Sequence, residues 1–226
     1  MSSQNFYGSD EEFAAFIREA CTGCTGRRPV LYRVTKRLFD LVASLGGLLL
    51  ILPLLPFIVM LIKLETPGPI FFKQLRVGYR GRMFHCYKFR SMTVDAEGRL
   101  AELRAQNELE GHAFKMSDDP RITPIGRAIR RWSIDELPQL WNVLRGDMSL
   151  VGPRPPLVSE VSDYDLWHRR RLSMKPGITG LWQVRSRSET VFDKWVEDDL
   201  EYIDRWSLWL DLQIMLRTIP AALDGR

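Results

Sequence analysis

Two adjacent carboxylates, Asp135 and Glu136, are the residues of this chain best suited to phosphate chemistry. They follow Ser133 at the expected start of a helix, and Arg130 and two further arginines stand just before them. Free amides and positive potential at a helix N-terminus favour a bound phosphate. A carboxylate there can ligate a divalent cation or attack phosphorus. Ser133 and Glu136 also fit a helix capping box, which has no catalytic role, and the local sequence favours neither interpretation.

Arg154 is a second candidate because it stands between Pro153 and Pro155. The flanking prolines restrict the backbone and would hold one guanidinium in a rigid loop. The alternative is a loop arginine in a surface ion pair. Asp199 and Asp211 lie in a late helical region, where their spacing alone indicates only a solvated face.

Other patterns in the chain carry little chemistry. Asp163 and Asp165 form a D-x-D, as in proteins that hold a metal on a nucleotide-sugar, but a solvated helix face explains them better. Cys21 and Cys24 form a C-x-x-C without the second pair that a zinc site needs. The histidines have no metal-binding spacing, and the glycine-rich phosphate loops are absent.

Composition sets the frame in which these residues must be positioned. The 226 residues suit one domain with a small appendage, and 45% hydrophobic and 27% charged residues are typical of a globular protein. A net charge of +4 suits anionic partners such as phospholipid or nucleotide. The polar first thirty residues do not read as a secretory signal.

One apolar segment, Leu41–Ile62, contains no charged residue. As a straight helix it would reach about 33 Å, enough to cross a bilayer core. Pro53 and Pro56 interrupt it, and an interior proline kinks or breaks a helix. Five Lys or Arg residues lie within 27–37 and seven within 63–90, so both flanks look cytoplasmic. A segment that enters the membrane, breaks near Pro53 and returns is therefore favoured over a spanning helix.

The whole chain is predicted to be an α+β protein, mostly helical with short strands and with amphipathic helices at a membrane interface. We expect a polar N-terminal arm at 1–35, a re-entrant membrane helix at 36–63 and a catalytic domain at 64–226. Within the last, the patterns predict strands at 70–72, 83–89 and 181–184 and helices at 95–110, 124–132, 135–145, 158–173 and 190–219. Gly146 is expected to end the helix over 135–145 as its C-cap.

Together these features resemble the monotopic phosphoglycosyl transferases, bacterial sugar transferases that begin the assembly of exopolysaccharide, O-antigen and related glycans. The resemblance extends from Lys36 to Pro220 and rests on many motifs in order. Besides the proline-broken segment, they are Lys36–Asp40, Pro67–Gln74, Tyr87–Met92, Ser133–Gln139, Ser149–Pro155, Lys175–Gly180 and the trio Asp199, Tyr202 and Asp211. Leu52 departs from the family, in which many compact members have Ser before the breaking proline.

The resemblance implies a reaction and its participants. Such an enzyme transfers a sugar 1-phosphate from a UDP-sugar to undecaprenyl phosphate and releases UMP. Asp135 would be the covalent nucleophile, and with Glu136 it would hold Mg²⁺. The substrate-binding candidates are Lys88, Arg90, Arg130, Pro153, Arg154, Pro155, Asp199 and Asp211. The resemblance further implies a catalytic domain on the cytoplasmic face of the bacterial inner membrane, contact with membrane lipid, no nucleic-acid partner and, on the family's example, a homodimer.

Two other functions remain open from the sequence. One is a membrane-anchored nucleotide-sugar glycosyltransferase that uses Asp163 and Asp165 and releases UDP. The other is a non-catalytic scaffold whose basic surface binds anionic lipid. The sugar and the glycan pathway leave no readable signal in these residues.

Overall fold

The computed structural model describes residues 30–111 and 113–223. Most of the predicted N-terminal arm, together with Cys21 and Cys24, lies outside this range. The predicted mixture of many helices and few short strands is confirmed. The helices are α2 (Val30–Ile51), α3 (Leu55–Glu65), α4 (Ala96–Leu103), α5 (Pro124–Arg131), α6 (Gln139–Arg145), α7 (Val158–Ser162), α8 (Leu166–Arg169), α9 (Leu181–Arg185), α10 (Phe192–Arg205) and α11 (Leu208–Leu223). The strands are β1 (Phe71–Val77), β2 (Met83–Phe89), β3 (Ser149–Val151) and β4 (Gly177–Thr179).

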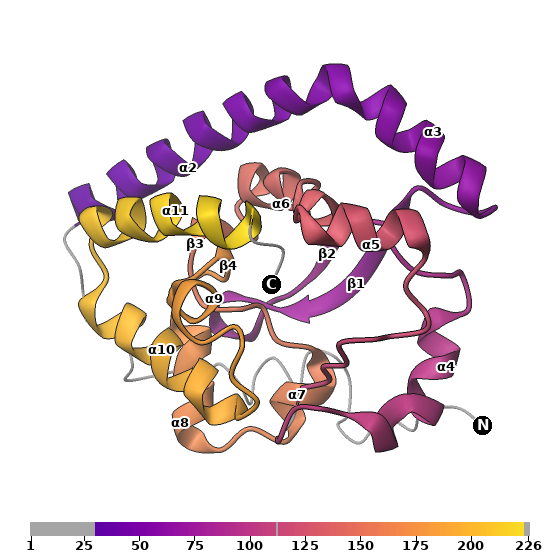
Figure 1. Cartoon of the computed structure of the whole chain (residues 1–226). Helices are drawn as coiled ribbons and strands as arrows, with labels where there is room; N and C mark the ends of the chain where they lie inside the picture. The colour runs from indigo at the N-terminus through magenta and orange to yellow at the C-terminus, as the bar shows by residue number, and fades with distance from the viewer. Residues whose placement is uncertain (1–29, 112, 224–226) are drawn as a thin grey trace.

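Helices α2 and α3 form an arch over the rest of the molecule (Figure 1). The two helices meet at a short 3₁₀ segment, Leu52–Leu54, that contains Pro53. The arch thus bends where the proline predicts a break. Val30–Glu65 is the one helical stretch of the described residues that is apolar and long enough to cross a bilayer, and only 11% of its most apolar window is buried. Length and composition do not distinguish a crossing helix from one that returns.

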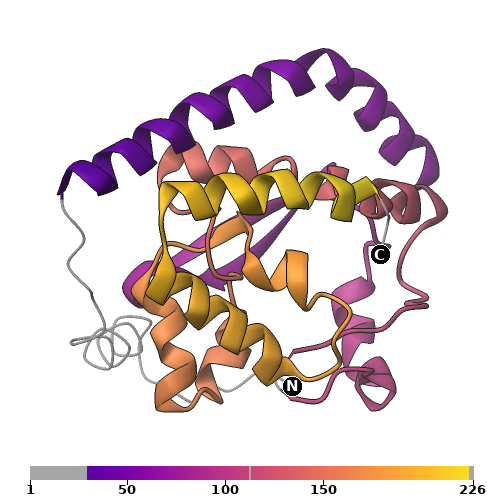
Figure 2. The same ribbon diagram turned by 60° about the vertical axis from the view of Figure 1, so that its left-hand side comes forward.

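The first half of the arch is fastened to the body by polar side chains. Lys36 Nζ lies 2.8 Å from Asp211 Oδ2, and Asp40 accepts hydrogen bonds from the Ser149 hydroxyl and the Leu150 amide. Arg37 donates to two carbonyls at the C-terminal end of α6. These side chains hold α2 against α6, β3 and α11 (Figure 2).

The second half of the arch rests on apolar contacts. Ile58 and Ile62 of α3 pack with Phe89 of β2 and Ile129 of α5 in one cluster. Glu65, the last residue of α3, accepts a hydrogen bond of 2.7 Å from the amide of Ile125. Both ends of the arch are therefore tied to the same body.

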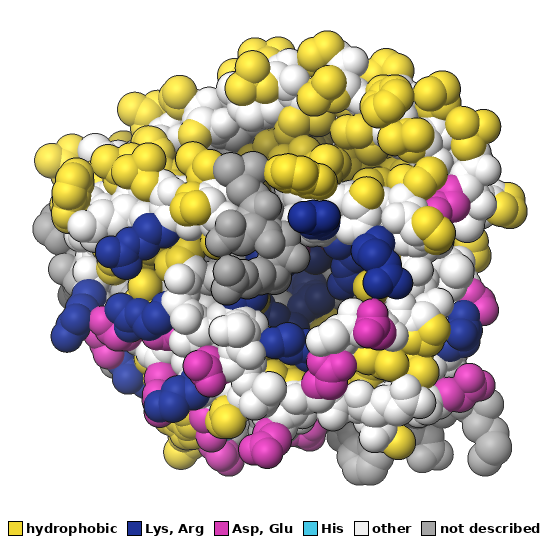
Figure 3. Space-filling view, viewed as in Figure 1, with side chains coloured by type: hydrophobic (Ala, Val, Ile, Leu, Met, Phe, Trp, Pro, Cys, Tyr) yellow, Lys and Arg dark blue, Asp and Glu magenta, His cyan; other side chains and the backbone are white. Residues whose placement is uncertain are grey.

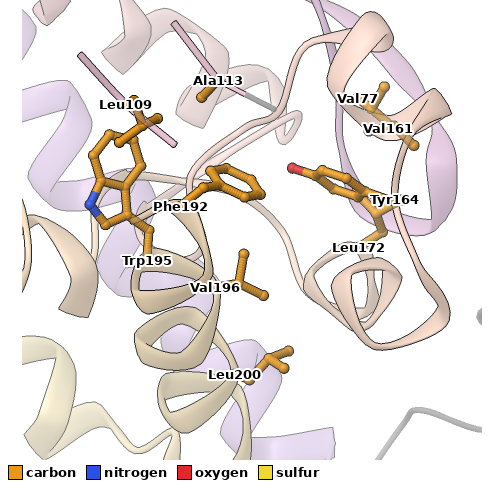
Figure 4. Packing of buried hydrophobic residues seen from close by; sticks show 10 residues of the cluster. All are labelled: Val77, Leu109, Ala113, Val161, Tyr164, Leu172, Phe192, Trp195, Val196 and Leu200. Carbon is orange, nitrogen blue, oxygen red and sulfur yellow. The ribbon is translucent and has the colours of Figure 1, made fainter. Parts of the chain in front are cut away.

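Two small sheets and a helical core make up that body. Strands β1 and β2 form an antiparallel hairpin, as predicted, although β1 extends to Val77. Strands β3 and β4 pair in parallel. Around Phe192 and Trp195 of α10, residues from β1, α7 and the 107–114 segment form a hydrophobic cluster (Figure 4).

Several predicted elements were wrong in type or extent. Leu181–Val184, predicted as a strand, belongs to helix α9, because a short apolar run fits either element and here α10 and α11 cover it as a helix. The strand lies just before it, in β4, where a Cβ on Gly177 would collide with the Gly152 backbone. The helix predicted over 158–173 is divided into α7, α8 and a 3₁₀ turn, and α4 ends at Leu103.

Candidate active site

Asp135 lies in the wall of a pocket of about 170 Å³. Lys and Arg side chains gather around a hollow below the apolar arch, and this basic lining is visible in Figure 3. The pocket combines residues from β1, β2, β4, α5, α6 and α9 with the segments around residues 133–136, 154–155 and 187. Its charged lining residues are Arg76, Lys88, Arg130, Asp135, Glu136, Arg154 and Arg187. Of the sequence-predicted residues, the pocket unites the Asp135–Glu136 pair with Lys88, Arg130, Arg154 and Pro155.

The backbone before Asp135 turns through a left-handed residue. Ser133 has φ 53° and ψ 22°, and its side chain makes no helix-capping hydrogen bond. Asp135 and Glu136 belong to a 3₁₀ turn, and α6 begins only at Gln139. The capping-box interpretation is therefore wrong, and so is a helix start at residue 135. Gly146 ends α6 in the left-handed region, as predicted.

The two neighbouring carboxylates have different environments. Asp135 is 6% exposed, and burial raises its pKa above the ordinary value, against the attraction of Lys88 and with a further contribution from Glu136. Burial would also raise the pKa of Glu136, but Lys88, whose Nζ lies 2.6 Å from Glu136 Oε1, together with Arg187 and Arg76 outweighs burial and lowers it. The geometry thus keeps Glu136 ionised and makes Asp135 the more easily protonated of the pair.

Two arginines at the pocket form no close ion pair with the described residues, although Arg130 acts to lower the pKa of Asp135 and Arg187 acts to lower that of Glu136 through electrostatic attraction. The Arg130 Nη1 is buried without a hydrogen-bond acceptor, and no ion pair engages the guanidinium of Arg187. Unpaired buried donors are costly, so these groups fit a ligand that supplies oxygen atoms. Arg187 escaped the sequence analysis because it belongs to no recognisable motif and follows a segment predicted as a strand.

The loop that carries Arg154 is held by buried ion pairs. The Arg154 guanidinium donates to both oxygens of Glu160, at 2.8 and 3.1 Å, and Glu160 outweighs burial in raising the pKa of Arg154. Asp199 accepts the Arg154 amide at 3.2 Å and pairs with Arg171 at 2.6 Å. Burial raises the pKa of Asp199 to about 6, against the opposing effect of Arg171. Glu160 and Arg171, which sequence reasoning missed, thus position this loop.

Several predicted substrate-binding residues lie away from the pocket lining. Asp199 is fully buried beneath the Arg154 loop. Asp211 contacts Lys36, Tyr202 and Trp206 between α2 and α11. Arg90 donates to the carbonyls of Pro67 and Thr66. In this structure these residues connect elements of the fold.

The D-x-D residues also lie outside the pocket lining. Asp163 ends α7 and Asp165 precedes α8, and both side chains are exposed. Tyr164 between them is buried in the core beside Phe192. The pair therefore lies at a helix junction and faces solvent, as the interpretation of a solvated surface predicted.

Comparison with known proteins gives a consistent result. Residues 31–225 match the family described as "Bacterial sugar transferase". The chain is 50% identical over 193 residues to "Galactosyl transferase CpsE" of Streptococcus agalactiae, covering 85% of this chain and 43% of that protein. It is 43% identical over 195 residues to "Undecaprenyl-phosphate galactose phosphotransferase" of Salmonella typhimurium, covering 84% and 41%.

A shorter relative matches over most of its length. "Exopolysaccharide production protein ExoY" of Rhizobium meliloti is 40% identical over 197 residues, which cover 85% of this chain and 87% of that protein. By contrast, the chain spans about two-fifths of the length of the Streptococcus and Salmonella relatives. The resemblance found in the sequence is confirmed, and the chain belongs to the bacterial sugar transferase family.

Proposed function

We propose that this protein transfers a hexose 1-phosphate from a UDP-sugar to undecaprenyl phosphate, and that Asp135 is the covalent nucleophile. The observation that carries the proposal is the environment of Asp135: a buried carboxylate in a basic pocket, where Arg130 Nη1 has no hydrogen-bond acceptor and Arg187 forms no close ion pair among the described residues. Phosphoryl transfer needs positioning and charge neutralisation, and arginines around one carboxylate supply both.

The reaction proceeds in two displacements. An oxygen of Asp135 attacks the phosphorus that bears the sugar, the bond from that phosphorus to the UMP oxygen breaks, and UMP leaves. A phosphate oxygen of undecaprenyl phosphate then attacks the same phosphorus and releases the Asp135 carboxylate. Glu136, kept ionised by Lys88, accepts a proton from the acceptor phosphate when that phosphate arrives as the monoanion.

A divalent cation fits this pair of carboxylates. The described residues contain no group of three or more side chains able to hold a metal ion. Mg²⁺, however, is commonly bound by one or two carboxylates together with substrate phosphates and water, so Asp135 and Glu136 suffice. When bound there, Mg²⁺ would neutralise charge on the diphosphate.

The membrane attachment follows from the apolar surface. The arch exposes large side chains along its length, among them Leu45, Leu50 and Phe57. On α11, the exposed Trp209, Leu212, Leu216 and Ile219 recur every three or four residues on one face. We infer that the arch enters one leaflet and returns, that α11 lies at the interface, and that the pocket opens toward lipid headgroups on the cytoplasmic face.

The proposals for the acceptor and the pathway rest on the chemistry of the site and on the names of the relatives. The Salmonella relative is named for undecaprenyl phosphate and galactose, and the Rhizobium relative for exopolysaccharide production. By analogy, this chain performs the first membrane step in assembling an exopolysaccharide or related glycan.

The released nucleotide tests the proposal. Purified protein in detergent or nanodiscs is incubated with UDP-hexoses, Mg²⁺ and undecaprenyl phosphate, and the nucleotide product is identified by chromatography. We expect UMP, and no product from Asp135→Asn. UDP as the product would favour a glycosyltransferase, and no nucleotide at all would favour a scaffold. Full activity of Asp135→Asn would refute the proposed nucleophile.

A further inference from the structure

One part of the pocket wall differs from the rest because it carries no charge. It is formed by the end of β4 and the start of α9, with Ile178, Trp182 and Gln183. The charged residues of the pocket come mainly from other elements. The carboxylates belong to the 3₁₀ turn before α6, and the cations come mainly from β1, β2 and α5. A ligand that spans the pocket therefore contacts charged side chains in one region and the Trp182 ring and Gln183 carboxamide in another.

The polar side-chain groups of Trp182 and Gln183 form no hydrogen bonds with the described residues. These groups are the indole N–H and the carboxamide, and each side chain is half-buried. The Trp182 ring is supported by Trp195, with ring centroids 5.0 Å apart. These donors and the amide oxygen are not buried orphans but line the pocket, so they are available to a ligand with a matching polar edge.

The position of this wall is fixed relative to the Arg154 loop. The Gly177 amide donates to the Pro153 carbonyl at 2.9 Å, and the Gly152 amide donates to the Thr179 carbonyl at 2.9 Å. A Cβ on Gly177 or Gly180 would collide with the backbone of Gly152. The uncharged wall and the Arg154 loop therefore form one rigid unit, as specific recognition requires.

We propose that Trp182 and Gln183 bind the uracil ring of the donor nucleotide, an inference that rests on the proposed function. Uracil is planar and can stack on the indole. Its N3–H and O4 form a donor–acceptor edge that pairs with both groups of the Gln183 carboxamide. The attacked phosphorus bears the sugar, so the proposed reaction places the sugar next to Asp135. The nucleoside lies one phosphate farther away.

Direct binding tests this assignment without turnover. Isothermal titration measures the affinity of the full-length protein for UMP, which has no hexose, and for CMP and inorganic pyrophosphate. We expect Gln183→Ala to weaken UMP binding by about tenfold while pyrophosphate binding and the melting temperature stay unchanged. Gln213→Ala, a half-buried glutamine of α11 outside the pocket lining, is the matched control and should bind UMP as the wild type does.

Two conservative variants separate recognition from folding. Gln183→Glu places an acceptor-only group opposite O4, so the UMP-to-CMP affinity ratio should fall by about tenfold, because a carboxylate accepts from the cytosine amino group. Trp182→Phe keeps a stacking ring and should lose less UMP affinity than Trp182→Ala.

The outcomes distinguish this inference from the proposed function. Unchanged UMP affinity in both Gln183→Ala and Trp182→Ala overturns the inference, and so does a wild-type protein that binds neither UMP nor UDP. Weaker binding of UDP-hexose with unchanged binding of UMP would assign the wall to the sugar. A wild type that binds UMP through Gln183 but releases UDP in turnover leaves the inference standing and refutes the proposed reaction.

Discussion

At the residue scale, the site depends on two adjacent carboxylates with opposite pKa shifts. Asp135 is buried and its pKa is raised, whereas Lys88 lowers the pKa of Glu136. Neighbouring acids held in different protonation equilibria are typical of sites that divide roles between them. The sequence predicted the pair and Arg130 but missed Arg187, and the contact of Glu136 with Lys88 joins residues 48 positions apart, which spacing cannot reveal.

The first prediction concerns pH. Asp135 acts as a nucleophile only when ionised, so activity should rise with pH through its raised pKa. Lys88 opposes that rise in pKa, and Lys88→Met should therefore move the acidic limb of the kcat profile to higher pH by roughly one unit. The control is Lys73→Met, an exposed lysine of the neighbouring strand, which should leave the limb in place. An unshifted limb in Lys88→Met contradicts the assigned electrostatics.

The second prediction concerns the left-handed turn before Asp135. Ser133→Val should lower the free energy of unfolding by about 1–2 kcal/mol, because β-branched residues are strained at positive φ. It should also reduce kcat by displacing Asp135, whereas Ser133→Gly should retain activity. Arg80, at φ 55° in the β1–β2 turn, provides the control. Arg80→Val should lose similar stability in chemical denaturation yet keep the kcat of the folded protein.

At the element scale, the site depends on loops held by buried ion pairs. The sequence correctly predicted the β1–β2 hairpin, α5 and the helical character of 190–219, which the structure divides into α10 and α11. The sequence pattern did not predict β4 and α9. Strand β4 depends on the close approach of Gly177 to Gly152, which no apolar pattern reveals. The support of Arg154 by Glu160, Arg171 and Asp199 was likewise hidden, because the partners come from three separate elements.

The third prediction tests that support. Glu160→Gln removes the charge that faces Arg154 and leaves the buried guanidinium partly unpaired, so we expect a loss of about 3 kcal/mol in the free energy of unfolding. In the folded fraction, KM for the UDP-sugar should rise more than kcat falls if Arg154, which lines the pocket, binds the donor as the family resemblance implies. Glu197→Gln breaks an exposed pair with Lys194 and should cost less than about 0.5 kcal/mol. Equal losses in both variants would contradict a positioning role for Glu160.

At the scale of the whole molecule, we propose that the arch holds the site at the membrane surface. Both ends of the arch contact the same body, through Lys36 and Asp40 at one end and Ile62 and Glu65 at the other. The proline break was predictable from the sequence, as was the positive charge on both flanks. The attachment of the arch was not, because it depends on buried pairs between distant segments such as Lys36 and Asp211.

The fourth prediction tests the re-entrant topology. In a cysteine-free background, single cysteines are placed at Leu31, Leu50 or Leu64, whose exposed fractions are 73%, 77% and 75%. A membrane-impermeant maleimide should label positions 31 and 64 from the same side of oriented vesicles, and should not reach position 50 within the lipid. Labelling of positions 31 and 64 from opposite sides would show a spanning helix and contradict the proposed topology.

The central claim is that Asp135 carries the sugar phosphate between donor and acceptor. The most direct measurement incubates the protein with a UDP-hexose and Mg²⁺ in the absence of undecaprenyl phosphate, followed by rapid acid quench and mass spectrometry. The account predicts release of UMP in proportion to a covalent hexose-phosphate adduct on the peptide that contains Asp135, and loss of the adduct when undecaprenyl phosphate is added. An active enzyme that forms no adduct and releases nucleotide only with the acceptor present would contradict it.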